Sequence, residues 1–156
     1  MARVKINSID DFLALKNVSL GESGWFEMSQ KLIDNFADAT FDHQWIHVDV
    51  ERAKRESPCA TTIVHGYFIL SLLPYLLNEI IEVNNLKQLV NYGIDKMTYK
   101  NVIPVNSCIR LSAFLKNARD LGNICKADIY CKFEIEGQGK PALEGTITYL
   151  YYFNQS

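Results

Sequence analysis

Hydrophobic and polar positions divide this chain into a first half of helical character and a second half of long strands. From residue 91 onward, runs rich in β-branched and aromatic residues are broken at residues 104–106, 120–123 and 137–141, where proline, glycine, asparagine and aspartate gather. The last run alternates, and one of its faces consists of Leu143, Gly145, Ile147, Tyr149, Tyr151 and Phe153. The pattern predicts a sheet of long antiparallel strands with one buried face.

The longest apolar segment, residues 63–77, lies ahead of these strands and is shorter than the roughly 18 residues that indicate a membrane span. It is interrupted by four less apolar residues, His65, Gly66, Ser71 and Pro74. The segment predicts a buried helix, which is apolar on too many sides to lie on a surface. The predicted fold class is therefore α+β, a hot-dog fold in which a long central helix is wrapped by an antiparallel β-sheet. Residues 1–156 are expected to form a single domain.

Shorter elements are predicted nearer the N-terminus. Ser8 can cap a helix over residues 9–15, because its hydroxyl can accept a hydrogen bond from a free backbone amide of the first turn. Residues 24–28 are expected to form a strand. Ser29 then opens a second helix over residues 30–38, and this helix leads the chain to the residues that carry the candidate chemistry.

Composition narrows the class of protein. The chain has 156 residues, of which 48% are hydrophobic, so it can bury a core without support from disulfides or metals. Its net charge of -2 and its pI near 5.9 give no general attraction to nucleic acid or to anionic membranes, and neither partner is expected. The first residues contain no apolar run of signal-peptide length, which favours a cytoplasmic location.

Cysteine and histidine usage gives no indication of a metal site. The four cysteines contain no CxxC pair and have no zinc-type histidine spacing, so we expect reduced and mostly buried thiols at Cys59, Cys108, Cys125 and Cys131. His43 is expected to face solvent or to have a structural role. A metal site built from the three histidines, His43, His47 and His65, is not expected.

Two groups suited to acid–base chemistry, Asp42 and His47, lie just ahead of the predicted central helix. On a helix their five-residue separation would place the side chains roughly 140° apart, and on a strand it would point them to opposite faces. They can meet only if the chain turns between them, and residues 42–45 are polar enough at their start for such a turn. From the spacing alone, an ordinary loop carboxylate and a structural histidine remain open as alternatives.

Two blocks, FADATFDHQWIHVD and TIVHGYFILSLLP, carry a family resemblance. They resemble the MaoC-like acyl dehydratases of the hot-dog superfamily, which include the (R)-specific enoyl-CoA hydratases, and are most similar to the NodN-like branch. The resemblance implies that Asp42 and His47 are catalytic. In that mechanism they hold one water, remove its proton as it attacks C3 of a trans-2-enoyl thioester, and return a proton at C2. The reverse reaction dehydrates a (3R)-hydroxyacyl thioester.

The same resemblance implies roles for two further residues, Gly66 and Ser71. Gly66 matches a glycine whose backbone N–H contacts the thioester oxygen, and Ser71 matches a serine that supports the catalytic loop. His65 is expected beside them as a hydrogen-bonded histidine at the helix start. The implied substrate is an acyl-CoA or acyl-carrier thioester, no cofactor or metal is required, and a homodimer or higher homo-oligomer is expected because hot-dog subunits usually pair their sheets edge to edge.

Some positions depart from the family pattern. Phe41 replaces a common glycine ahead of Asp42, and its side chain is expected to disfavour a positive φ angle and to fill part of the acyl pocket. Residues 58–62 lack the usual small glycines. Cys59 lies near the predicted site and is expected to be a buried, inert thiol. These departures keep open an acyl-thioester-binding module with little turnover, while a hot-dog thioesterase is less favoured by the motifs.

Overall fold

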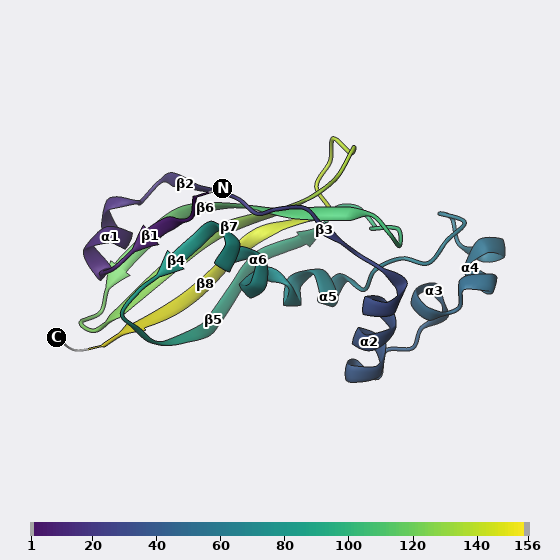
Figure 1. Ribbon diagram of the computed structural model, residues 1–156, viewed down its shortest axis with the longest axis horizontal. Coiled ribbons are helices and arrows are strands. Elements are labelled where there is room, and N and C mark those ends of the chain that lie inside the picture. Colours follow the sequence, from purple (N-terminus) through teal and green to yellow (C-terminus); the bar gives the residue numbers. More distant parts are fainter. Residues whose placement is uncertain (1, 155–156) are drawn as a thin grey trace.

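The computed structural model describes residues 2–154 and contains a long antiparallel sheet with helices along one side and beyond one end (Figure 1). Four long strands dominate the sheet, β5 Leu86–Tyr99, β6 Cys108–Asp120, β7 Ile124–Ile135 and β8 Leu143–Phe153. Their order is β6-β7-β8-β5, so β5 pairs with β8 and not with its neighbour in sequence. The predicted antiparallel strands are confirmed, and the three predicted breaks fall at the connections between them.

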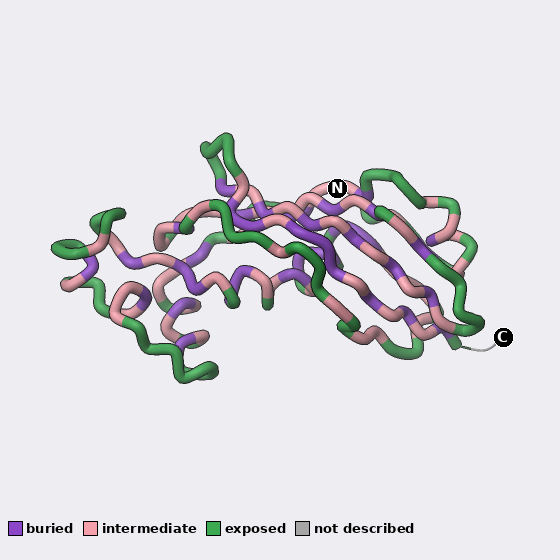
Figure 2. The backbone as a smooth tube through the Cα atoms, turned by 180° about the vertical axis from the view of Figure 1, so that it is seen from behind, coloured by how far each residue is buried: buried purple, intermediate pink, exposed green. Residues whose placement is uncertain are grey.

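Burial alternates along the inner strands. Every second residue of β7 is buried, and in β8 all six residues of the predicted inner face are buried (Figure 2). Phe133 on β7 is fully buried, and Tyr151 on β8 packs its ring 4.6 Å from that of Phe12. This face of the sheet therefore forms the main part of the core.

The central helix differs from its prediction. It begins at Gly66 and is divided into α5 Gly66–Ser71 and α6 Leu73–Ile80, so a single long helix over residues 63–77 is wrong in its ends and its continuity. Pro74 explains the division, because a proline has no N–H to donate to the carbonyl four residues earlier. The buried side chains of α6 are Leu73, Leu76, Leu77 and Ile80, and they pack against the inner face of the sheet. Within residues 2–154, no helix has the length and apolar character of a membrane span.

The N-terminal segment adds small elements to the far end of the sheet. The predicted cap is confirmed, since the Ser8 hydroxyl accepts from the Asp11 N–H at the start of α1 Ile9–Ala14, and the Asp11 carboxylate accepts from the Ser8 N–H. β1 Val4–Ile6 pairs in parallel with β4 Ile81–Val83, a pairing that the sequence pattern does not reveal.

The predicted strand over residues 24–28 is wrong in extent. Only β3 Phe26–Glu27 forms there, and a longer strand, β2 Val18–Glu22, precedes it. Both pair with β6 and extend the sheet beyond it. The β2 register shifts next to Gly21, whose φ of 117° suits a residue without a side chain, and this irregularity breaks the alternation from which a strand would be predicted.

Three short helices lie beyond the other end of the sheet. They are α2 Gln30–Thr40, α3 Trp45–Val48 and α4 Val50–Glu56 (Figure 1). The predicted helix after Ser29 is confirmed and runs two residues further than expected, to Thr40. Exposed residues are frequent in the loops at this end of the molecule (Figure 2). These helices bury few side chains of their own, but Ile33 of α2 belongs to the core cluster, with Leu32 and Phe36 packed against it, and polar contacts add to this packing.

Candidate active site

The chain turns sharply between α2 and α3. Phe41 ends α2 in the left-handed conformation, with φ at 62°, and residues 42–44 then form an irregular segment before α3 begins at Trp45. The turn brings the Asp42 carboxylate back over α3, which carries His47. Convergence of these two side chains requires such a turn, and the backbone supplies it.

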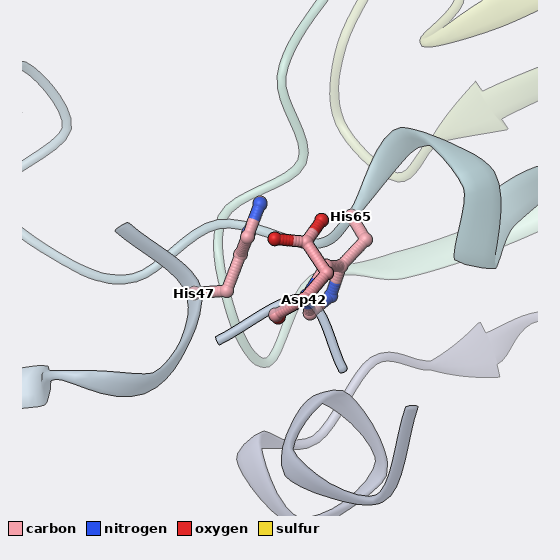
Figure 3. A group of neighbouring side chains, drawn as sticks. All are labelled: Asp42, His47 and His65. Atoms are coloured by element: carbon pink, nitrogen blue, oxygen red, sulfur yellow. The ribbon is translucent and has the colours of Figure 1, made fainter. Parts of the chain in front are cut away.

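Asp42, His47 and His65 form a compact trio (Figure 3). A carboxylate oxygen of Asp42 and one ring nitrogen of each histidine all lie within 4.8 Å of one another. His47 and His65 are buried, whereas Asp42 is exposed. The trio therefore combines two sheltered imidazoles with a carboxylate that solvent or a substrate can reach.

Hydrogen bonding fixes the protonation of the His47 ring. Its Nδ1 lies 2.7 Å from the carbonyl oxygen of Ile63. Because a carbonyl can only accept, Nδ1 carries the hydrogen, and the neutral ring has its lone pair on Nε2. Burial is the main cause that lowers the pKa of His47 below 6.5, with His65 acting in the same direction; the Ile63 hydrogen bond and Asp42 oppose the shift. The ring is thus neutral and able to accept a proton at neutral pH.

His65 contacts both of the other residues. Its Nε2 donates to the main-chain carbonyl of Asp42 at 2.9 Å, and its ring stacks on that of His47 with centroids 3.7 Å apart and planes inclined by 24°. Its Nδ1 is buried and has no hydrogen-bond partner among residues 2–154. The expected hydrogen-bonded histidine at the helix start lies here, at the N-cap of α5.

The stacking also bears on metal binding. Imidazole nitrogens bind metals through lone pairs that lie in the ring plane, about 2 Å from the ion. The His47 and His65 planes are nearly parallel, at 24°, so their lone pairs cannot converge on one ion at that distance. In the described orientation, the two histidines are therefore not placed to bind one ion together.

Gly66 lies next to the trio at the start of α5. As the first residue of that helix, it has an N–H without an intrahelical acceptor. The ring of Tyr99 packs over the glycine so closely that a Cβ at position 66 would lie 2.7 Å from Tyr99 Cε1. His47, Gly66 and Tyr99 line a mostly apolar cavity of about 300 Å³, together with Ile63, Val64, Ile69, Lys100, Asn101, Val102 and Ile103.

A family model described as a MaoC-like domain matches residues 15–131 of the chain, a stretch that includes the whole trio and its cavity. The chain belongs to the MaoC-like dehydratase family. The predicted family membership is therefore confirmed.

Two curated relatives refine the position of the chain within the MaoC-like family. The 3-hydroxyacyl-thioester dehydratase Z of Mycobacterium tuberculosis (strain H37Rv) is 41% identical over 136 residues, which cover 86% of this chain and 89% of that protein. Nodulation protein N of Rhizobium leguminosarum bv. viciae is 37% identical over 126 residues, which cover 80% and 78% respectively. The second match supports the predicted similarity to the NodN-like branch.

A solved structure confirms the predicted hot-dog fold. The (R)-hydratase from A. caviae involved in PHA biosynthesis superimposes with a TM-score of 0.69, covering 83% of this chain and 93% of that one. Because only 20% of the residues are identical, the likeness speaks for the fold alone.

Phe41, the main departure from the MaoC-like pattern, behaves differently from its prediction. It adopts a positive φ despite its side chain, and that side chain is 86% exposed. The expectation that it fills part of a pocket is wrong for this chain, because the left-handed turn directs the ring outward. Ala60 likewise has a positive φ, of 52°, without glycine.

The prediction of mostly buried thiols is correct for Cys125 and Cys131, only partly correct for the half-buried Cys108, and wrong for Cys59. Cys125 and Cys131 are buried, and burial raises the pKa of each thiol to about 12. Cys59 is exposed in the irregular segment after α4, where few apolar side chains are available to cover it.

Ser71 lies apart from the trio in the described chain. Its hydroxyl donates to the carbonyl of Tyr67 one turn earlier, at 2.7 Å, and it lines a different cavity, between α5–α6 and β5. His43 is exposed and contacts the Asp38 carboxylate at 2.9 Å. Among residues 2–154, no hydrogen bond joins the side chain of Ser71 or His43 to the side chain of Asp42 or His47, and a supporting role for Ser71 stays a prediction.

One residue at the site was missed by sequence reasoning. The side chain of Gln30, at the start of α2, contacts the main chain of His47 and the hydroxyl of Thr62. These partners lie 17 and 32 residues away, so no local spacing indicates the contacts.

Proposed function

We propose that this chain is a hydro-lyase that adds water reversibly to trans-2-enoyl thioesters and, in reverse, dehydrates 3-hydroxyacyl thioesters. The observation that carries the proposal is the approach of the Asp42 carboxylate to the trio's sheltered imidazoles, beside the cavity that Gly66 lines. The relative named 3-hydroxyacyl-thioester dehydratase Z supports a thioester as the substrate class.

In the proposed reaction, His47 and Asp42 share one water. His47 Nε2 removes a proton as the water oxygen bonds to C3, and the Asp42 carboxylate holds the water by accepting its other hydrogen. The electron pair of the C2–C3 double bond moves toward the thioester carbonyl. C2 then takes the proton back from the imidazolium, so hydroxide has been added at C3 and a proton at C2, and both side chains return to their starting state.

Gly66 is proposed to stabilise the negative charge on the thioester oxygen. A main-chain N–H without an intrahelical acceptor can donate to a developing oxyanion, and such donors act strongly in a sheltered site. The apolar cavity beside it would hold the thioester arm or the acyl chain. The proposal needs no cofactor or metal.

The test is the loss of enoyl-thioester absorbance with crotonyl-CoA and longer trans-2-enoyl-CoAs. Asp42→Asn and His47→Ala are expected to keep the fold and to lower turnover by about 10²-fold or more. His43→Ala, which alters an exposed histidine in the same turn, is the matched control and should keep the parent rate. Parent-like rates in Asp42→Asn or His47→Ala would remove the assignment.

The alternative, a thioester-binding module with little turnover, was suggested by two departures from the family pattern, Phe41 and residues 58–62, and the first no longer supports it. It rested on a pocket filled by Phe41, and that side chain is exposed. Saturable binding of an enoyl-CoA by folded parent protein, without product, would still favour it.

We further propose a homodimer formed through β5. This strand has 14 residues, lies at the edge of the sheet, and carries the exposed apolar side chains Tyr92 and Ile94. These two residues also line a cavity of about 510 Å³ with residues of α5 and α6. A second copy would cover this apolar edge. Light scattering after size exclusion should give a dimer mass for the parent and a monomer mass for Ile94→Glu.

A further inference from the structure

The catalytic helix α3 has only four residues, so it cannot satisfy its own last carbonyl groups. The carbonyl of His47 accepts instead from the side-chain amide of Gln30, at 2.8 Å. Gln30 belongs to α2, a separate helix, so its amide joins α2 to the main chain of the proposed base.

The same amide reaches a third segment. The Thr62 hydroxyl donates to Gln30 Oε1 at 2.6 Å, and Thr62 is fully buried. The next residue, Ile63, supplies the carbonyl that accepts from His47 Nδ1. Gln30 therefore links the main chain that carries the His47 ring to the segment that fixes the ring's tautomer.

The orientation of the Gln30 amide is determined by its partners. Nε2 faces two acceptors, the His47 carbonyl and the Asp34 carboxylate, each at 2.8 Å, while Oε1 faces a hydroxyl. A flipped amide would place an oxygen against both acceptors. Both N–H groups of the amide donate and its oxygen accepts once, so three hydrogen bonds fix the orientation of the side chain.

We infer that Gln30 is a positioning residue, which holds His47 at the distance from Ile63 that keeps the hydrogen on Nδ1 and the lone pair on Nε2. The inference rests on the proposed function, since that lone pair is the proposed base. Gln30 does not line the cavity beside Gly66, so it acts on the reaction only indirectly, through the main chain of His47 and through Thr62 next to Ile63.

Two replacements separate this role from simple stabilisation. Gln30→Met keeps the approximate shape and removes all three hydrogen bonds. Thr62→Val keeps the volume and removes one of them. Asp34→Asn is the matched control. It removes the charge from the acceptor of the third Gln30 hydrogen bond and leaves the hydrogen bonds of Gln30 with His47 and Thr62 intact.

The deciding measurement is the tautomer of His47, read from the ¹⁵N chemical shifts of histidine-labelled protein at a temperature well below unfolding. The chain has three histidines, so the signals can be assigned by single replacements. We expect the Nδ1–H form in the parent and in Asp34→Asn, and a mixture of both neutral forms in Gln30→Met. A tautomer in Gln30→Met that is identical to the parent's, even with a lower melting temperature, would overturn the inference and leave Gln30 as a stabilising contact.

Kinetics provide the second readout. We expect kcat to fall about tenfold in Gln30→Met with KM changed by less than about twofold, because the substrate contacts are retained. The tautomer measurement needs no substrate, so it distinguishes two failures. A parent that turns over no enoyl-CoA while the tautomer responds to Gln30→Met would refute the proposed reaction and uphold the positioning role. If the parent is active and Gln30→Met changes neither kcat nor the His47 tautomer, the positioning role alone would be refuted.

Discussion

The sheet and the helical end that carries the site are built by different means. In β6, β7 and β8, buried side chains alternate with partly exposed ones along strands of 11 to 13 residues, and neighbouring strands share a continuous apolar layer. In α2, α3 and α4 the buried residues are few, and main-chain carbonyls at this end also accept from side chains such as Gln30 on α2 and His65 at the N-cap of α5. Most of the buried apolar core thus lies in the sheet, whereas the candidate site lies in the helical end.

Because of this difference, we expect mutations in the sheet to affect mainly stability and mutations in the helical end to affect mainly activity. Removal of apolar volume from the sheet lowers the free energy of unfolding in proportion to the cavity left behind. Removal of a polar contact from the helical end should leave most of the core intact and displace one of the proposed reacting groups, and small displacements of reacting groups lower rates strongly.

The largest expected effect is on stability, from Phe133→Ala in β7. The side chain is fully buried, so the free energy of unfolding should fall by about 3–5 kcal/mol. Urea denaturation measures the change, and kcat per folded molecule should stay within about twofold of the parent. Leu121→Ala, at an exposed turn next to the same strand, should change stability by less than about 0.5 kcal/mol. Equal decreases in the free energy of unfolding of the two variants would contradict the assignment of Phe133 to the stabilising core.

Gly66→Ala should lower kcat/KM by about tenfold or more with little loss of stability. The new Cβ would lie 2.7 Å from the Tyr99 ring, so either the ring or the proposed N–H donor must move. Gly139→Ala is the control, since a Cβ there meets nothing within 4 Å. If the clash is the cause, Tyr99→Ala should recover part of the rate when combined with Gly66→Ala, and no recovery in this pair would argue against it.

The pH dependence of the reaction should follow His47. Its pKa lies below 6.5, so kcat/KM should be level near neutrality and then fall about tenfold per pH unit once the pH is below that lowered pKa. Stability should change in the same direction. As the pH falls below 6.5, His47 is protonated in the unfolded chain before it is protonated in the folded one. The contribution of neutral His47 to the free energy of unfolding is therefore fully present above pH 6.5, and it is lost as the pH falls from 6.5 to the lower pKa of the folded chain.

Rate and unfolding profiles for the parent, His43→Ala and His47→Gln measure both effects. The control His43→Ala should keep the parental acid limb, whereas His47→Gln should lose the stability change along with the activity. An acid limb centred above pH 6.5 in the parent would contradict the assignment of His47 as the base.

The smallest effect is expected from Phe41→Gly. A residue with a side chain at φ 62° carries a steric cost that glycine avoids, and the greater freedom of glycine in the unfolded chain offsets part of the gain. Thermal or urea unfolding should show a gain of about 0.5–1 kcal/mol, with kcat unchanged because the side chain is 86% exposed. A clear loss of activity would show that the ring contacts the substrate after all.

The sheet could be predicted because its signals are local. In β8 the alternation from Leu143 to Phe153 is visible residue by residue, and the glycines of the turns before β7 and β8 adopt positive φ angles at Gly122 and Gly137. β2 escaped prediction because its partners are distant, with Val18 paired to Leu115, and because Gly21 interrupts its pattern. The central helix was predicted, but the effect of Pro74 on its continuity was underestimated.

The candidate site could be predicted only in part from the sequence. Asp42, His47 and Gly66 followed from the family resemblance, and no periodicity would have paired them. The contacts of Gln30 with His47 and Thr62 depend on how α2 packs beside α3, which the sequence pattern does not encode. Phe41 was misjudged because a turn fixed at both ends can impose a positive φ on a residue that would avoid it in a free chain.

The hydrogen bonds that hold the site have a consequence for how such enzymes can diverge. His65 binds the carbonyl of Asp42 and Gln30 binds the carbonyl of His47, and every residue type has a main-chain carbonyl. Replacement of the side chain of Asp42 or His47, the proposed reactive groups, therefore leaves these main-chain contacts in place. New acids, bases or nucleophiles at residues 42 and 47 could be selected, by evolution or in the laboratory, without first rebuilding the loop that presents them.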